Sequence, residues 1–240
     1  MINNIINPIF ERLALLTGED GLKKLSNTNV LIFGAGGVGS WAAEALTRSG
    51  IGKIGIIDHD IVCASNINRQ IQATIQTLNM PKVSVLGKRL LEINAECKIT
   101  VYNELFCLEK KHDFDIEKAD YVIDAIDTVN HKLDLIETTA GFNVTLFSSM
   151  GMAFKTDPSK IKTASVWKTD GCPLARIVRQ GLRKRMFGGD FTVVYSNEPA
   201  IRTQQAGQRL NASIVTVTAS AGLLLANLVI QDVLKNRDKH

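Results

Sequence analysis

Short apolar runs alternate with amphipathic segments along the first two-thirds of the chain. Five runs rich in β-branched residues predict strands at residues 29–33, 53–57, 98–102, 121–125 and 144–148. Three segments between them have apolar residues at helical spacing and predict helices at residues 39–49, 82–94 and 131–141. Such alternation is typical of right-handed β–α–β units, so we expect an α/β fold with a doubly wound, mostly parallel sheet.

The pattern changes after residue 151. Two further runs, at residues 163–167 and 191–195, predict isolated strands on either side of a helix at residues 173–185. An apolar segment at residues 219–234 predicts a buried closing helix; Asn227, Gln231 and Asp232 interrupt it, so no membrane span is expected. We therefore expect one domain over residues 1–240. Residues 1–151 would form a nucleotide-binding core, and residues 152–240 a C-terminal elaboration that binds the substrate.

Composition narrows the class of protein further. The 240 residues are 45% hydrophobic and 22% charged, which is ordinary for a soluble globular protein. The net charge of only +4 means that a nucleic-acid partner would have to be met by a local basic face. Four scattered cysteines without a C-x-x-C pair argue against a zinc ribbon and against a disulfide framework. The first ten residues lack the features of a signal peptide, and we expect a cytoplasmic protein.

A glycine-rich turn follows the first predicted strand. It contains Gly34, Gly36, Gly37 and Gly39, and it leads directly into a predicted helix. Glycines there allow a tight turn and close approach of the backbone to a ligand, and the helix N-terminus attracts an anion. Asp58 ends the second strand, where a carboxylate can bind ribose hydroxyls. Together these features predict a Rossmann-like nucleotide site.

Polar residues beyond Asp58 favour ATP over NAD. The segment after it supplies Asn66, Arg69 and Gln70, Lys82 begins the next helix, and Asp127 follows the fourth strand. A triphosphate with Mg²⁺ requires cations near its oxygens and a carboxylate for the metal. An NAD-dependent oxidoreductase would need only the glycine turn and Asp58, and ordinary solvated loop charges are the simplest alternative.

The ordered motifs G-x-G-G-x-G, D-x-D, S-N-x-x-R-Q, P-K and A-I-D resemble the ubiquitin-activating-like superfamily, whose members activate carboxylates with ATP and Mg²⁺. The resemblance implies a sheet of the ubiquitin-activating type. It assigns the ribose to Asp58, the phosphates to Asn66, Arg69 and Lys82, and the Mg²⁺ to Asp127. It also implies a homodimer in which an arginine before the first strand enters the partner's ATP site. Arg12, in Phe10-Glu11-Arg12, is the candidate.

Further segments resemble one branch of that superfamily, the tRNA threonylcarbamoyladenosine dehydratases. They are SWAAEAL after the glycine turn, PLAR at residues 173–176, VVYS at 193–196 and AGL at 221–223. The branch uses ATP to convert the threonylcarbamoyl group on adenosine 37 of tRNA to its cyclic form. The resemblance thus implies a tRNA substrate, and it leaves open a cysteine desulfurase sulfur-relay system as a partner.

A basic segment offers a surface for tRNA phosphates. Five cations occur within ten residues that contain no acid: Arg176, Arg179, Arg183, Lys184 and Arg185. Four lysines nearby would widen that surface: Lys155, Lys160, Lys162 and Lys168. The competing interpretation is a solvated charged helix.

Three other functions stay open. The first is an activating enzyme for a ubiquitin-like sulfur-carrier protein, against which the missing zinc cysteines and the basic helix count. In such an enzyme Cys172 would be the candidate thioester nucleophile, while a neutral loop cysteine is the alternative. The others are the NAD-dependent oxidoreductase and a non-catalytic nucleotide sensor.

Overall fold

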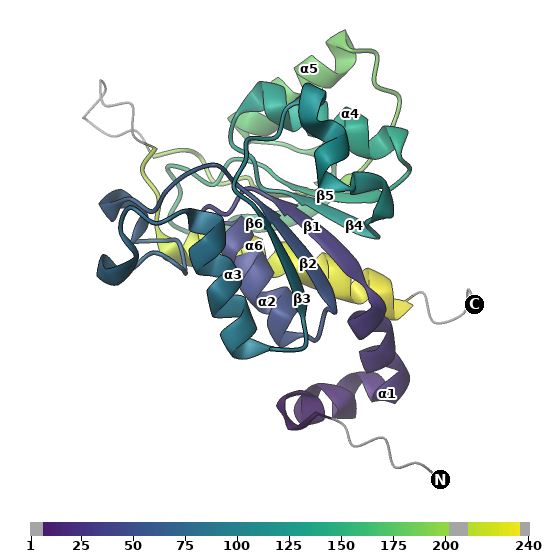
Figure 1. The fold of residues 1–240 in the computed structure, drawn as a ribbon. Helices are drawn as coiled ribbons and strands as arrows, with labels where there is room; N and C mark the ends of the chain where they lie inside the picture. The colour runs from purple at the N-terminus through teal and green to yellow at the C-terminus, as the bar shows by residue number, and fades with distance from the viewer. Residues whose placement is uncertain (1–6, 202–210, 236–240) are drawn as a thin grey trace.

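Seven strands form one sheet in the order β3–β2–β1–β4–β5–β7–β6 (Figure 1). The computed structural model describes residues 7–201 and 211–235. The strands are β1 (Asn29–Phe33), β2 (Lys53–Ile57), β3 (Lys98–Tyr102), β4 (Tyr121–Asp124), β5 (Thr145–Ser149), β6 (Ile161–Ser165) and β7 (Thr192–Ser196). Every neighbouring pair is parallel except β6–β7, which is antiparallel at the edge. The predicted α/β, doubly wound, mostly parallel sheet is confirmed.

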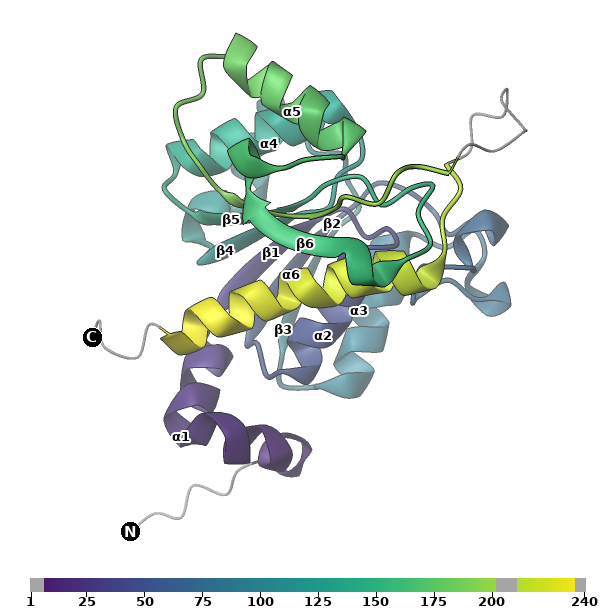
Figure 2. The ribbon, with the colours of Figure 1, turned by 180° about the vertical axis from the view of Figure 1, so that it is seen from behind.

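Helices cover both faces of this sheet (Figures 1 and 2). The helices of the described residues are α1 (Glu11–Asn27), α2 (Gly39–Arg48), α3 (Lys82–Ile93), α4 (Val129–Gly141), α5 (Pro173–Lys184) and α6 (Val215–Lys235), and of these α1 projects beyond the end of the sheet. Apolar side chains of α2, α3 and α6, such as Leu46, Leu86 and Leu225, are buried together in one core. Those of α4 and α5, such as Leu133 and Val178, form the core on the other face. Each face of the sheet therefore has its own hydrophobic layer.

The closing helix α6 is the one described helix long and apolar enough to cross a membrane by length and composition. Its buried side chains, which include Val217, Ala221, Leu225 and Val229, face α2 and the sheet. At Gly222 a Cβ would lie 2.3 Å from the carbonyl oxygen of Val38, so glycine permits this close contact with the start of α2. The expected packing of this segment as a core helix is confirmed.

The C-terminal elaboration differs from the expectation in two respects. The strands predicted as isolated pair with each other and extend the main sheet through β5. β6 also begins at Ile161, two residues before the predicted start, and Val166–Lys168 forms a 3-10 turn instead of continuing the strand. The apolar run therefore gave the right element but the wrong boundaries, because the chain leaves the sheet where Val166 turns into the core.

Candidate functional site

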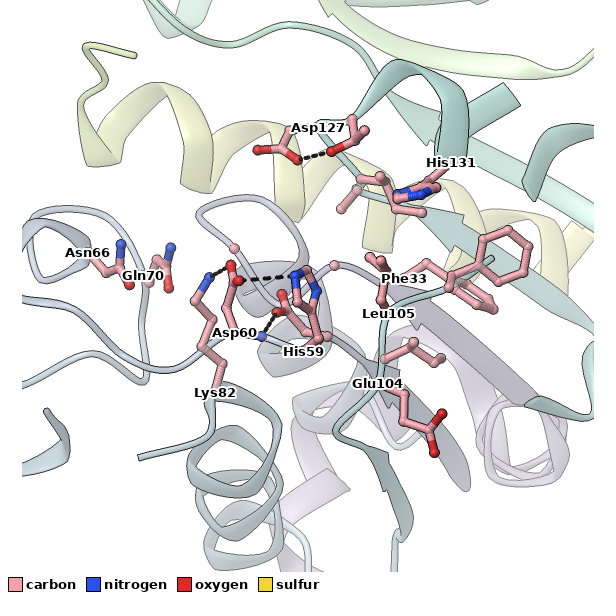
Figure 3. Close-up of a pocket in the computed structure, with 18 of the residues that line it drawn as sticks. Phe33, His59, Asp60, Asn66, Gln70, Lys82, Glu104, Leu105, Asp127 and His131 are labelled. Atoms are coloured by element: carbon pink, nitrogen blue, oxygen red, sulfur yellow. Dashed lines mark hydrogen bonds and ion pairs between the residues drawn. The ribbon is translucent and has the colours of Figure 1, made fainter. Parts of the chain in front are cut away.

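A cavity of about 290 Å³ opens at the carboxyl ends of β1, β2, β3 and β4 (Figure 3). Parallel strands present their C-terminal loops along this edge, where such sheets bind ligands. Most of the residues predicted to bind nucleotide line it: Gly34, Gly36, Asp58, Asn66, Arg69, Gln70, Lys82 and Asp127. Its remaining wall includes side chains that sequence reasoning missed, namely Phe33, Glu104, Leu105, Phe106 and His131.

The glycine turn forms one wall of the cavity. Gly34 has φ +98°, and a Cβ there would lie 2.6 Å from the carbonyl oxygen of Ala125. A Cβ at Gly39 would lie 1.8 Å from the carbonyl oxygen of Gly34. Gly36 instead faces open space within the cavity, so a ligand can approach its backbone. Gly37 and Gly39 shape the turn without lining the cavity, and α2 begins beside it with its positive dipole end.

Asp58 is held beside this turn by two backbone groups. Its Oδ2 accepts the N–H of Ala35 at 2.7 Å, and its Oδ1 accepts the N–H of Asp60 at 2.8 Å. Each carboxylate oxygen retains further acceptor capacity. The carboxylate is therefore fixed at the end of β2 and can accept hydrogen bonds from ribose hydroxyls.

Lys82 begins α3, lines the cavity and forms an ion pair with Asp60. Its Nζ lies 2.7 Å from Oδ2 of Asp60, and the side chain of Lys82 is only 7% exposed, against 52% for Asp60. Figure 3 shows the pair beside His59, whose Nε2 lies 3.5 Å from the other oxygen of Asp60. Asp60 is the second acid of the D-x-D motif, and sequence reasoning gave it no role.

Arg69 lies against the glycine turn. Its guanidinium donates to the carbonyl oxygen of Ser65 at 2.7 Å and to Oδ1 of Asn68 at 2.9 Å. A Cβ at Gly37 would lie 3.1 Å from Cγ of Arg69, so glycine leaves room for the arginine side chain to pack against the turn. The indole N–H of Trp41 fixes the Arg69 backbone by donating to its carbonyl oxygen at 3.0 Å.

Three amide side chains surround the same turn. Asn66 accepts the N–H of Cys63 through Oδ1, so its amide nitrogen is the group that could donate to a ligand. Gln70 is 5% exposed, and among the described residues its Oε1 is buried without a hydrogen-bond partner. Gln72, which the sequence did not single out, donates to the carbonyl oxygen of Ala35 at 2.8 Å. Asn66 and Gln70 therefore line the cavity, while Gln72 fixes the backbone of the turn.

Asp127 lies on the loop after β4, facing the cavity from the side opposite Lys82 (Figure 3). It is exposed, and the hydroxyl of Thr128 donates to its Oδ1 at 3.3 Å. An exposed carboxylate beside a phosphate-sized cavity suits Mg²⁺, which binds one or two carboxylates together with phosphate oxygens. Asp127 therefore stays the predicted ligand of Mg²⁺.

Arg12 does not reach the cavity of its own chain. It is an exposed residue of α1, which lies before the start of β1 (Figure 1). The cavity, by contrast, opens where β1 ends. The structure thus separates Arg12 from the other predicted catalytic residues, Arg69, Lys82 and Asp127.

The five predicted tRNA-binding residues differ in availability. Arg176, Arg183 and Lys184 are exposed, and Arg183 lies 5.7 Å from the centre of the Trp167 ring. Arg179 is half-buried and donates to the hydroxyl of Thr169. Arg185 forms ion pairs with Asp134 at 2.6 Å and Glu137 at 2.7 Å, which attach the end of α5 to α4.

The flanking lysines differ in the same way. Lys160, Lys162 and Lys168 are exposed. The expectation that Lys155 widens the surface is wrong, because it is buried and donates to the carbonyl oxygen of Ser196 at 3.0 Å. Lys155 therefore ties its loop to the end of β7.

Sequence and structure comparisons agree on a single family. The ThiF family pattern matches residues 10–240. The tRNA threonylcarbamoyladenosine dehydratase of Bacillus subtilis (strain 168) is 36% identical over 241 residues, which cover 95% of each chain. The chain belongs to the ThiF family, in its tRNA threonylcarbamoyladenosine dehydratase branch.

Solved structures of this branch have the same fold. The chain is similar to E. coli tRNA N6-threonylcarbamoyladenosine dehydratase, TcdA, in complex with AMP, with a TM-score of 0.90 and 32% identity over 98% of this chain and 97% of that one. The ATP complex of TcdA gives a TM-score of 0.89 with the same coverage. The sulfur carrier protein ThiS adenylyltransferase of E. coli (strain K12) is 31% identical over only 56% of this chain and 53% of its own. The sulfur-carrier alternative thus corresponds to a more distant relative.

Proposed function

We propose that this protein uses ATP to dehydrate N6-threonylcarbamoyladenosine at position 37 of tRNA to its cyclic form. The observation that carries the proposal is the match to dehydratases over almost the entire length of both chains. The cavity supports it, because it gathers cations, a ribose-binding carboxylate and a metal-binding carboxylate around a glycine turn. An oxidoreductase would leave Arg69, Lys82 and Asp127 without a role.

The chemistry follows from the weakness of a carboxylate as an electrophile. Attack on it by a neighbouring atom of the carbamoyl side chain requires that one carboxylate oxygen first become a leaving group. Reaction with ATP achieves this, and ring closure then expels that oxygen with the nucleotidyl or phosphoryl group, so that the net change is the loss of water. Because the ring closes within one molecule, the protein needs mainly to position the groups and neutralise charge.

The residues of the cavity divide this work between them. Asp58 would fix the ribose, and the backbone at Gly36 with the N-terminus of α2 would hold a phosphate. Arg69 and Lys82 would neutralise charge that develops on the phosphate oxygens, and the amides of Asn66 and Gln70 would orient them. Asp127 would hold Mg²⁺, which supplies charge neutralisation as a Lewis acid when bound.

A homodimer completes this account. Because Arg12 lies at the far end of the sheet from its own cavity, it could act only in the cavity of a second copy. The same helix exposes Leu15 and Leu16, at 88% and 83%, beside a kink at Gly18. Figure 2 shows that α1 projects from the body of the molecule. Exposed apolar side chains on such a helix suit contact with another chain.

The two parts of the chain would have different roles. Residues 1–151 would carry the nucleotide chemistry, and residues 152–240 would bind tRNA through the exposed cations of α5. We place the protein in the cytoplasm, where its tRNA substrate is found. The resemblance to the dehydratases also leaves a cysteine desulfurase sulfur-relay system open as a partner.

Nucleoside analysis tests the reaction. The protein is incubated with ATP, Mg²⁺ and tRNA that carries threonylcarbamoyladenosine, and the digested nucleosides are examined by mass spectrometry under conditions that preserve the cyclic form. We expect a nucleoside lighter by one water, formed only with ATP. Unchanged threonylcarbamoyladenosine in the presence of folded protein and ATP would reject the proposed function.

A further inference from the structure

A fully buried ion pair lies behind the loop that carries Asp127. The Nζ of Lys132 is 2.7 Å from Oδ2 of Asp124, and both side chains are 0% exposed. The hydroxyl of Ser148 donates to the same oxygen at 2.6 Å, and Lys132 also donates to the carbonyl oxygen of Ser149 at 3.0 Å. The network thus joins the last residue of β4, the first turns of α4 and the end of β5.

This network encloses the β4–α4 loop at both ends. Asp124 precedes the loop and Lys132 follows it, so their ion pair closes residues 125–131 into a short ring. The other oxygen of Asp124 accepts the N–H of Ile126 at 3.0 Å, which fixes the backbone one residue before Asp127. Residues Ala125 to Thr128 line the cavity. The position of the Asp127 carboxylate therefore depends on side chains that do not touch the cavity themselves.

Stability alone does not account for such a pair. Removing two charges from water is costly, and a buried ion pair can often be replaced by apolar side chains without loss of stability. The elements that carry the network, β4, α4 and β5, also bury apolar side chains such as Val122, Leu133 and Leu146. Its three hydrogen bonds to one carboxylate instead specify a single loop geometry, which is what a metal ligand requires.

We propose that Lys132, Asp124 and Ser148 are positioning residues that fix the 125–128 loop so that Asp127 can bind Mg²⁺ together with ATP. This proposal rests on the proposed function. It extends the site beyond the residues of the cavity, to groups that act on the metal only through the backbone of the loop. Its consequence is that weakening the network lowers the Mg²⁺-dependent part of ATP binding selectively.

Calorimetric titration with ATP, at a series of Mg²⁺ concentrations and once with EDTA, tests this selectivity. Ser148→Ala removes one hydrogen bond from Asp124 and leaves no charge unpaired. We expect it to raise the Mg²⁺ concentration for half-maximal ATP binding about 10-fold, at the lower end of the effects seen when outer partners of metal ligands are removed. ATP affinity in EDTA should stay at the wild-type value. Lys132→Met should show a larger effect of the same kind where it folds.

Thr139→Val is the matched control. Thr139 has a fully buried hydroxyl and lies on α4, the helix of Lys132. This hydroxyl donates to the carbonyl oxygen of Leu135, away from the loop. A lowered melting temperature in both variants, with wild-type Mg²⁺ dependence in both, would show a purely structural network and overturn the proposal. If wild-type protein binds ATP equally with and without Mg²⁺, the metal role of Asp127 is wrong and this proposal fails, whereas cyclisation of tRNA would still be testable separately.

Discussion

The cations of the cavity are held by oxygen atoms of the protein itself. Lys82 pairs with Asp60, and Arg69 donates to the backbone of Ser65. An ammonium group has three N–H donors, so Lys82 can keep Asp60 and still donate to a phosphate. Positive charge is therefore oriented before the nucleotide arrives, which lowers the reorganisation needed during reaction.

The cysteines give the clearest prediction for single residues. Cys172 is 5% exposed and lies at the start of α5, outside the ATP cavity. Because ring closure needs no protein thiol, Cys172→Ala is expected to leave kcat/KM for tRNA close to the wild-type value. Cys63→Ala, at an exposed cysteine, is the control.

Loss of turnover in folded Cys172→Ala, with Cys63→Ala active, would mean that a covalent step through Cys172 takes place. Thiol labelling of the native protein tests a separate prediction, that buried and exposed cysteines differ in reactivity. Burial raises the pKa of Cys97 to about 11, so this thiol stays protonated near pH 8 and should label far more slowly than the exposed Cys63.

Among the elements, α5 carries both exposed cations and cations that are already in contact with other groups of the protein. Its apolar side chains, Ala175, Val178 and Leu182, pack into the core, while Arg176 and Arg183 face solvent. Arg185 is different, because its charge is already shared with two acids of α4. The five cations that look equivalent in the sequence are therefore divided by the contacts of the helix.

Charge reversal on α5 should weaken tRNA binding selectively. We expect Arg176→Glu with Arg183→Glu to raise KM for tRNA about 10-fold or more, with KM for ATP unchanged, because phosphate contacts are lost. The slope of log affinity against log salt should fall by about 1 for each contact removed. Steady-state kinetics at two or more salt concentrations measure both effects.

Arg185→Gln supplies the comparison for this experiment. It should lower the melting temperature by loosening α5 from α4 and change KM for tRNA little. A charge reversal that raises KM no more than Arg185→Gln does, or that leaves KM unchanged, would mean that the exposed cations of α5 do not bind tRNA.

At the scale of the whole molecule, the location of Arg12 predicts complementation between two inactive variants. Arg12→Ala and Asp127→Ala should each abolish turnover. In a mixed dimer, the subunit with intact Asp127 receives Arg12 from its partner, so one of two sites is complete. An equal mixture that exchanges freely should recover roughly a quarter of wild-type activity.

Absence of recovery after verified subunit exchange would mean that Arg12 does not act in the partner's cavity. The control mixes Asp58→Ala with Asp127→Ala, two residues of the same cavity. No complete site can form in that mixture, so it should remain inactive.

The fold and most of the cavity could be predicted because they depend on local patterns. The first three strands end where their apolar runs end, and parallel pairing then brings Asp58 and Asp127 to one edge. Helix α1 was not predicted, since its exposed leucines provide no buried stripe within one chain. The ion pairs of the charged residues were not predictable either. Lys82 pairs with Asp60, and Lys132 with Asp124, only because the folded chain brings them together.

The central claim is that ATP activates the threonyl carboxylate, and isotope transfer tests it most directly. The tRNA is prepared with ¹⁸O in both oxygens of that carboxylate and reacted with ATP and Mg²⁺ in unlabelled water. We predict that one ¹⁸O appears in the released AMP or phosphate for each ring formed, and that the cyclic nucleoside keeps the other. Cyclic product with no ¹⁸O in either AMP or phosphate would contradict the account, because the carboxylate oxygen would then have left without ATP.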